Sequence, residues 1–272
     1  MVSRVQASMY AFVGFTVVQI LVFLFQPGFY EALAPGLCAA PKYVALRLIG
    51  LKEIGLMAMY LVGTANEDLT VIKATIAGRL SVILYTSYIV FHLGVPTYFL
   101  FGILQDVSFG LWTLREVLYY ERKSTIGEPA AYLQPLDSSW KQATKIVIFL
   151  AGFCEFGAAA FNFNRLSQAE SSLLRENVGL LSYEYMSSLV GSYQMYFACT
   201  DVHHLIYLAV GIHHLLYFLN RSDVTGMLTM LGIQEEATTL RFHLYFGCLI
   251  ILLVGFNHIN ALLRKPQHLK LH

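Results

Sequence analysis

The chain has 272 residues, of which 57% are hydrophobic and only 13% are charged, and its formal net charge is +1. Soluble domains usually carry about 25% charged residues, so this composition excludes an ordinary soluble domain and predicts a protein whose partner is the lipid bilayer. Binding to nucleic acid needs a concentrated basic patch, and the near-neutral charge excludes that partner.

Crossing the bilayer takes about 20 mainly apolar residues. Eight segments satisfy this requirement, although the second, sixth and seventh contain polar residues. The segments are 8–26, 44–63, 71–92, 95–118, 143–163, 180–200, 202–220 and 240–262. The sequence therefore predicts an all-α fold, a polytopic transmembrane bundle of about eight spanning helices. Asp201 directly precedes the seventh segment, where it is expected to cap the helix.

Lysine and arginine residues near the segment ends indicate the orientation, because they are enriched in cytoplasmic loops. With eight spans, ten of these residues fall on one side and five on the other. The ten are Arg4, Lys73, Arg115, Arg122, Lys123, Lys141, Lys145, Arg264, Lys265 and Lys270. A multi-pass protein with both termini on the cytoplasmic, or topologically equivalent, side is expected.

The only long hydrophilic connection, 121–140, divides the chain into halves of four segments each, 1–120 and 141–272. Short stretches match between the halves, for example Leu48-Ile49-Gly50 with Leu189-Val190-Gly191. Four spans per half give both halves the same orientation. The pattern predicts an internal repeat of the parallel kind.

The first half also resembles a known family. The stretches that carry the resemblance are Arg47-Leu-Ile-Gly-Leu-Lys-Glu-Ile-Gly, Ala77-Gly-Arg-Leu and Gln105-Asp106-Val-Ser-Phe-Gly. They are similar to the DoxX-like membrane proteins, four-helix proteins with a Gly-rich R-x-x-G stretch in helix 2, a G-R pair in helix 3 and an inward Asp in helix 4. The resemblance covers about residues 8–118 and only faintly the second half. It implies a four-helix fold, here as a tandem duplication, and an association of some members with quinone-linked redox complexes.

Charged side chains in apolar segments cost about 2.5–3.5 kcal/mol on insertion scales, so each one points to a ligand site or to a pairing partner. The candidate ligand-binding residues are Arg47, Glu53, Arg79, Asp106 and Glu155. They could bind an anionic or quinone-like headgroup or relay protons. The structural alternative is internal ion pairing, such as Arg79 with Asp106, or Glu53 with Lys52 or Arg47.

Histidines gather in the last two segments, and the candidate haem or metal ligands are His203, His214, His243 and His258. His203 and His214 share a helix face but lie about 16 Å apart along the axis, so one metal ion cannot bind both. Axial haem ligands can come from different helices. A haem between the last two segments therefore stays an alternative.

No nucleophile elbow and no nucleotide-binding motif occur in the sequence, which favours a protein that is not an enzyme. Three functions remain open. The first is an integral membrane subunit or scaffold of a larger complex, with other membrane subunits as partners. The second is a protein that binds or transports a small molecule or lipid headgroup through the polar residues of segments two to four. The third is a redox protein that holds haem or quinone.

Overall fold

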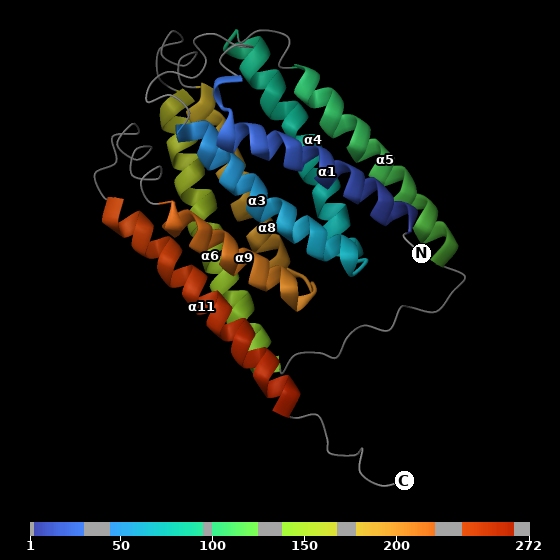
Figure 1. The fold of residues 1–272 in the computed structure, drawn as a ribbon, viewed down its shortest axis with the longest axis vertical. Helices are drawn as coiled ribbons and strands as arrows, with labels where there is room; N and C mark the ends of the chain where they lie inside the picture. Colours follow the sequence, from blue (N-terminus) through green and yellow to red (C-terminus); the bar gives the residue numbers. More distant parts are fainter. Residues whose placement is uncertain are drawn as a thin grey trace.

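The structure is a computed structural model that describes residues 3–29, 44–94, 100–124, 138–167, 178–220 and 236–263. These residues form helices and short turns without any strand, which confirms the predicted all-α fold (Figure 1). The helices are α1 (Arg4–Phe25), α3 (Val44–Ala65), α4 (Leu69–Ser87), α5 (Leu100–Ser124), α6 (Ser138–Ser167), α8 (Val178–Cys199), α9 (His204–Leu219) and α11 (Glu236–Leu263). A π-helical turn, η1 (Tyr88–His92), continues α4.

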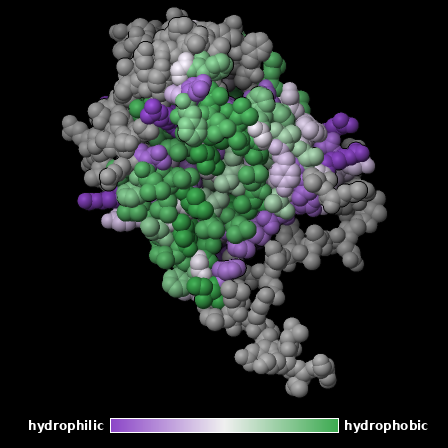
Figure 2. Space-filling view, viewed as in Figure 1, coloured by the Kyte–Doolittle hydropathy of each residue, from purple (hydrophilic) through white to green (hydrophobic). Residues whose placement is uncertain are grey.

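Four helical stretches are long and apolar enough to cross a membrane. They are Arg4–Phe25, Leu69–His92, Ser139–Leu166 and Thr239–Ile259. Their outward side chains are apolar as well, and one face of the molecule is largely hydrophobic (Figure 2). Apolar side chains directed away from the protein require lipid rather than water around them. The chain is therefore a helical membrane protein.

The more polar helices α3 and α8 lie inside the bundle. Among the described side chains, each exposes one large apolar residue, Leu61 on α3 and Tyr196 on α8. By contrast, α1 alone exposes six, Tyr10, Phe15, Val17, Val18, Leu21 and Phe25. A helix that is shielded from lipid by other helices needs no apolar outer face, and α3 can therefore contain the buried Lys52 and Glu53.

The helices pack as two sets of four. In the N-terminal set, α1 packs against α3 and α5, and α4 packs against α3 and α5. In the C-terminal set, α6 packs against α8, α9 and α11, and α9 packs against α11. Between the sets, α3 packs against α8 and α9, while α4 packs against α8. The predicted connection at 121–140 is shorter than expected, because α5 continues to Ser124 and α6 begins at Ser138; residues 125–137 lie outside the described part.

Hydrogen bonds and apolar packing join the two sets. The Tyr60 hydroxyl of α3 donates to the Tyr193 hydroxyl of α8 at 2.9 Å, and Tyr193 donates to the Ala74 carbonyl of α4 at 3.1 Å. The main apolar cluster also contains residues of both sets, such as Val71 and Ile206. The two sets therefore share one core.

The start of α1, the α3–α4 turn, the α8–α9 turn and the end of α11 lie at one end of the bundle, here called the termini end (Figure 1). Asp68 caps α4 by accepting from the backbone N–H groups of Thr70 and Val71, and it also accepts from the backbone N–H of His203 at 3.0 Å. His203 caps α9, so the expected cap at Asp201 is wrong.

Asp201 instead forms ion pairs with Lys141 and Lys145 of α6, at 2.6 and 2.9 Å. The hydrogen bonds from these two ammonium groups, with Lys141 contributing most, lower the pKa of Asp201 to about 2. The side chain is drawn away from the start of α9, which explains why it does not cap that helix. It ties the α8–α9 turn to α6 instead.

Candidate functional site

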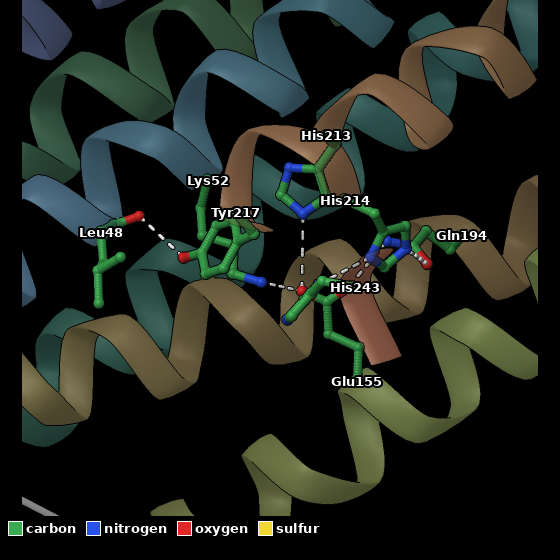
Figure 3. Close-up of polar contacts among 8 residues, drawn as sticks. All are labelled: Leu48, Lys52, Glu155, Gln194, His213, His214, Tyr217 and His243. Carbon is green, nitrogen blue, oxygen red and sulfur yellow. Dashed lines mark hydrogen bonds and ion pairs between the residues drawn. The ribbon is translucent and has the colours of Figure 1, made fainter. Parts of the chain in front are cut away.

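The most buried charged side chain of the described chain, Lys52, meets a buried carboxylate where the two sets join. Lys52 of α3 is 1% exposed and forms an ion pair with Glu155 of α6 (Figure 3). The ammonium group also lies 4.1 Å from the ring centroid of Tyr217 of α9, whose hydroxyl donates to the Leu48 carbonyl of α3 at 3.0 Å. The ring face stabilises the cation, and the tyrosine is itself fixed to α3. Three helices thus hold Lys52 in place.

A chain of hydrogen bonds leads from this ion pair into the C-terminal set. Gln194 of α8 donates from Nε2 to Glu155 Oε2 at 2.8 Å, and its Oε1 faces Nε2 of His214 on α9 at 3.3 Å. His214 Nδ1 lies 2.9 Å from Nδ1 of His243 on α11. We call Lys52, Glu155, Gln194, His214 and His243 the buried polar chain. Its five members come from five different helices and are all buried.

The hydrogen bonds of the buried polar chain all point the same way, from donor to acceptor, along the chain. An amide oxygen can only accept, so His214 donates from Nε2 to Gln194. Neutral His214 then accepts at Nδ1, which makes His243 the donor of the last bond. Hydrogen bonds therefore run from His243 through His214 and Gln194 to Glu155, which Lys52 approaches from the other side. The arrangement concentrates donors on a single carboxylate.

His213 lies beside the Glu155 carboxylate, and its imidazole forms no hydrogen bond with any described residue. It is fully buried, and its Nε2 lies 3.7 Å from Glu155 Oε1 (Figure 3). Its ring occupies the space where a side chain at position 55 would lie, so that only Gly55 fits there. The imidazole is held beside the carboxylate and could accept or donate a proton there.

The residues predicted in segments two to four do not form one cluster with this site. Arg47 is exposed on α3, whereas Glu53, Arg79 and Asp106 lie on the inner side of the N-terminal set. Arg79 donates to Thr113 Oγ1 at 3.1 Å and to Met9 Sδ at 3.3 Å.

The guanidinium of Arg79 lies 3.7 Å from the ring centroid of Phe12. Asp106 is within electrostatic range of Arg79 and of Glu53. Even so, no described carboxylate forms an ion pair with Arg79. The pairing of Arg79 with Asp106 suggested by the sequence is thus an electrostatic interaction at longer range.

The four candidate histidines occupy two places. His214 and His243 belong to the buried polar chain, while His203 lies at the termini end beside His204, whose ring is 6.1 Å from that of His258. A haem iron bound by His214 and His243 would have to lie between their facing nitrogens together with the macrocycle. Their direct 2.9 Å contact leaves no room for it. Nor do the described residues contain a group of three or more histidine, cysteine or acidic side chains that could hold a metal ion.

Sequence alone identifies Glu155 but not the partners that define its chemistry. Lys52 and Gln194 stand out only as polar residues in apolar segments, and the sequence suggests Glu53 as the partner of Lys52. Adjacent residues on a helix point in directions about 100° apart. Lys52 therefore turns toward Glu155 of another helix, while Glu53 faces the N-terminal set, within electrostatic range of Asp106.

The chain matches none of the protein family models, curated proteins or solved structures with which it was compared. The resemblance to DoxX-like proteins consequently stays a prediction, and the function has to be argued from the geometry.

Proposed function

We propose that the chain spans the membrane eight times, with both termini on the cytoplasmic or equivalent side. Each described helix overlaps one of the eight predicted segments, and α3, at about 33 Å, is long enough to cross. The inner position of α3 and α8 explains why these helices are less apolar than the outer ones. The basic residues Arg4, Lys73, Lys141 and Lys145 lie in the first two turns of α1, α4 and α6, and Lys141 and Lys145 pair with Asp201 of the α8–α9 turn at the termini end, which supports the cytoplasmic orientation.

We further propose that the two sets are tandem copies related by an approximate two-fold axis along the membrane normal. The pairing of α3 with α9 corresponds to that of α8 with α4, and α1 with α5 corresponds to α6 with α11. The N-caps Asp68 and His203 touch each other, as equivalent groups do at a two-fold axis. Eleven residues after each cap, Arg79 and His214 both point into their own set. The caps and these two residues pair positions that are 135 residues apart, whereas the sequence match of Gly50 with Gly191 pairs positions 141 residues apart.

The function that this geometry supports best is proton translocation across the membrane, with Glu155 as the proton acceptor. One observation carries the proposal: the Lys52–Glu155 ion pair, buried in a membrane protein, connects the N-terminal set to the C-terminal set. Coupling sites of transporters built from repeats lie near mid-membrane at the interface between the repeats. Ionisable side chains within membranes commonly belong to proton relays.

Protonation of Glu155 would change the contact between the two sets. A neutral carboxyl no longer attracts the Lys52 ammonium, so one link between the sets weakens. Loss of the proton from Glu155 restores the ion pair with Lys52. Because a ligand shifts a conformational equilibrium by its different affinity for the two states, proton binding would favour the arrangement in which Lys52 and Glu155 are apart.

A scaffold role, the first expectation from the sequence, explains the apolar outer surface but not the buried polar chain. A buried ion pair adds little stability compared with well-packed apolar side chains of similar size. A purely structural subunit would gain nothing from placing five polar side chains of five helices in its interior. Proton transfer gives each of them a use.

Proton flux into proteoliposomes tests the proposal. A valinomycin-induced potassium diffusion potential drives protons inward, and an enclosed pH dye reports their entry. We expect wild-type vesicles to acidify faster than protein-free vesicles, and Glu155→Gln to reduce the rate to that of protein-free vesicles. Tyr60→Phe is the matched control, because it removes a different buried contact between the same two sets without removing a charge. Wild-type flux equal to that of empty vesicles, or unchanged flux in Glu155→Gln, would refute the proposal.

A further inference from the structure

A second buried acid lies in the C-terminal set, closer to the end of the bundle opposite the termini end. Glu184 of α8 is 2% exposed and accepts a hydrogen bond from Asn162 Nδ2 of α6 at 3.2 Å. It lies six residues after the start of α8, about 9 Å along the helix axis. The buried polar chain does not include this carboxyl, so the mechanism above leaves it without a role.

Glu184 is in electrostatic range of the Lys52–Glu155 ion pair. The charged and titratable groups facing it are Lys52 of α3, Glu155 of α6, Tyr217 of α9 and Tyr183 of its own helix. One ammonium group therefore faces two carboxylates in a desolvated site. The second carboxylate is then a buried charge without compensation, which costs several kcal/mol. A proton bound to one of the two carboxylates neutralises that charge.

A polar stripe on α8 connects Glu184 to the buried polar chain. Glu184, Ser187, Gly191 and Gln194 follow one another at spacings of three or four residues, so they share one helix face. α6 packs antiparallel against this face, with Asn162 bonded to Glu184 at one level and Glu155 bonded to Gln194 at the other.

Ser187 lies between the two levels of this stripe. It is 4% exposed, and the Tyr183 hydroxyl is the polar group that interacts with its hydroxyl, outside ideal hydrogen-bond geometry. Buried hydroxyl groups are nearly always hydrogen-bonded. A buried hydroxyl at a level between two acids is suited to pass a proton, because it can accept one proton while it donates its own.

From this arrangement we infer that Glu184 loads the proton that Glu155 receives, from the end of the bundle opposite the termini end and through the Ser187 hydroxyl. The inference rests on the proposed proton translocation. In the transfer, an O–H bond breaks at Glu184 and one forms at Glu155. Glu184 returns to its carboxylate form, Ser187 ends with the proton count it began with, and no electrons move to another group.

The test uses the same proteoliposomes, with flux recorded over a range of external pH. Glu184→Gln keeps an oxygen for Asn162 but cannot be protonated, and we expect it to lower the flux and to flatten its pH dependence. Glu184→Asp should restore the pH dependence, and Ser187→Ala should lower the flux without changing the pH of half-maximal rate. A merely structural role for Glu184 predicts the same pH profile in Glu184→Gln as in the wild type, which would overturn the inference.

The outcomes separate this inference from the proposed function. If wild-type vesicles conduct no protons, both fail. If Glu155→Gln abolishes flux while Glu184→Gln leaves it unchanged, only the assignment of Glu184 fails. Flux that depends on sodium and not on pH overturns the proton assignment in favour of a metal cation.

A measurement on the unaltered protein covers the case in which Glu184→Gln does not fold. Dicyclohexylcarbodiimide, an apolar reagent, modifies protonated carboxyl groups within membranes. Peptide mass spectrometry of wild-type protein in vesicles should find the label on Glu184. Labelling of Glu155 with none on Glu184 would contradict the loading role.

Discussion

Replacing Lys52 by methionine isolates the energetic role of the central ion pair. Methionine has a length similar to that of lysine. It keeps contact with the Tyr217 ring, which lies beneath the ammonium group in the wild type. Glu155, only 7% exposed, then remains buried with Gln194 as its remaining hydrogen-bond donor. The variant thus removes a charge and leaves the packing largely intact.

The burial of the ion pair determines how much free energy of unfolding each variant loses. Removing one partner of a buried pair destabilises by about 3–5 kcal/mol, because the other charge is left without compensation. Lys52→Met and Glu155→Leu should each show such a loss. The double variant removes both charges of the pair, and Gln194 Nε2 loses its acceptor, which costs about 1–3 kcal/mol. The double variant should therefore be more stable than either single variant.

Titration of the purified protein from mild detergent into SDS, followed by far-UV circular dichroism, measures these free energies. Circular dichroism is preferable to tryptophan fluorescence because Trp112 and Trp140 are both on the surface, 41% and 36% exposed. If the losses of the two single variants simply add in the double variant, to about 6–10 kcal/mol, the two side chains do not interact and the reasoning is refuted. The double variant should also fail to conduct protons although it is folded.

Three further predictions concern packing, capping and pH. Gly191→Ala should destabilise by about 1–3 kcal/mol, because its β-carbon would lie 2.7 Å from a backbone oxygen of α6; Gly157→Ala, with nothing within 4 Å, is the control that should lose nothing in the same SDS titration. Asp68→Ala should cost about 0.5–2 kcal/mol as a lost cap and lower the melting temperature, whereas a Ser at this position should recover the α4 cap but not the bond to His203. The pKa of Asp201, about 2, lies below its ordinary value of 3.8, so its stabilising effect is present above about pH 4 and is lost as the pH falls through about 2. Since this side chain is 77% exposed, Asp201→Asn should change stability at pH 7 by less than about 1 kcal/mol, and added salt should remove the difference; a larger, salt-resistant loss would contradict this.

Apolar runs make the helices predictable, because each lipid-facing segment must contain enough apolar residues to cross. The predicted segment 44–63 differs from α3 by two residues at one end. The segment 95–118 fits less well, since α5 continues past the apolar run to Ser124. Its last turns can be polar once they leave the hydrocarbon, and Glu121 there forms an ion pair with Lys73 at 2.5 Å. Hydropathy therefore locates the helices better than it locates their ends.

The site is less predictable, because it depends on which helices become neighbours. Glu155 is recognisable as a carboxyl in an apolar run, but its partner lies 103 residues away, on a helix of the other set. The contact between His214 and His243 likewise joins α9 to α11 across 29 residues. Residue type and spacing within a segment contain no information about these contacts, which arise only when helices distant in the sequence pack together.

The same sequence separation affects the biogenesis of the protein. Synthesis proceeds at about 5–20 residues per second, so Lys52 leaves the ribosome roughly 5–20 s before Glu155. In the proposed eight-span arrangement, α3 enters the bilayer during that interval with an ammonium group whose final partner has not yet been made. The helix must therefore wait at the insertion machinery, beside its neighbours or with its lysine reaching toward the lipid headgroups. Insertion of the first four helices should accordingly be reversible until α6 arrives, and a chain truncated before Glu155 should be a substrate for membrane quality control.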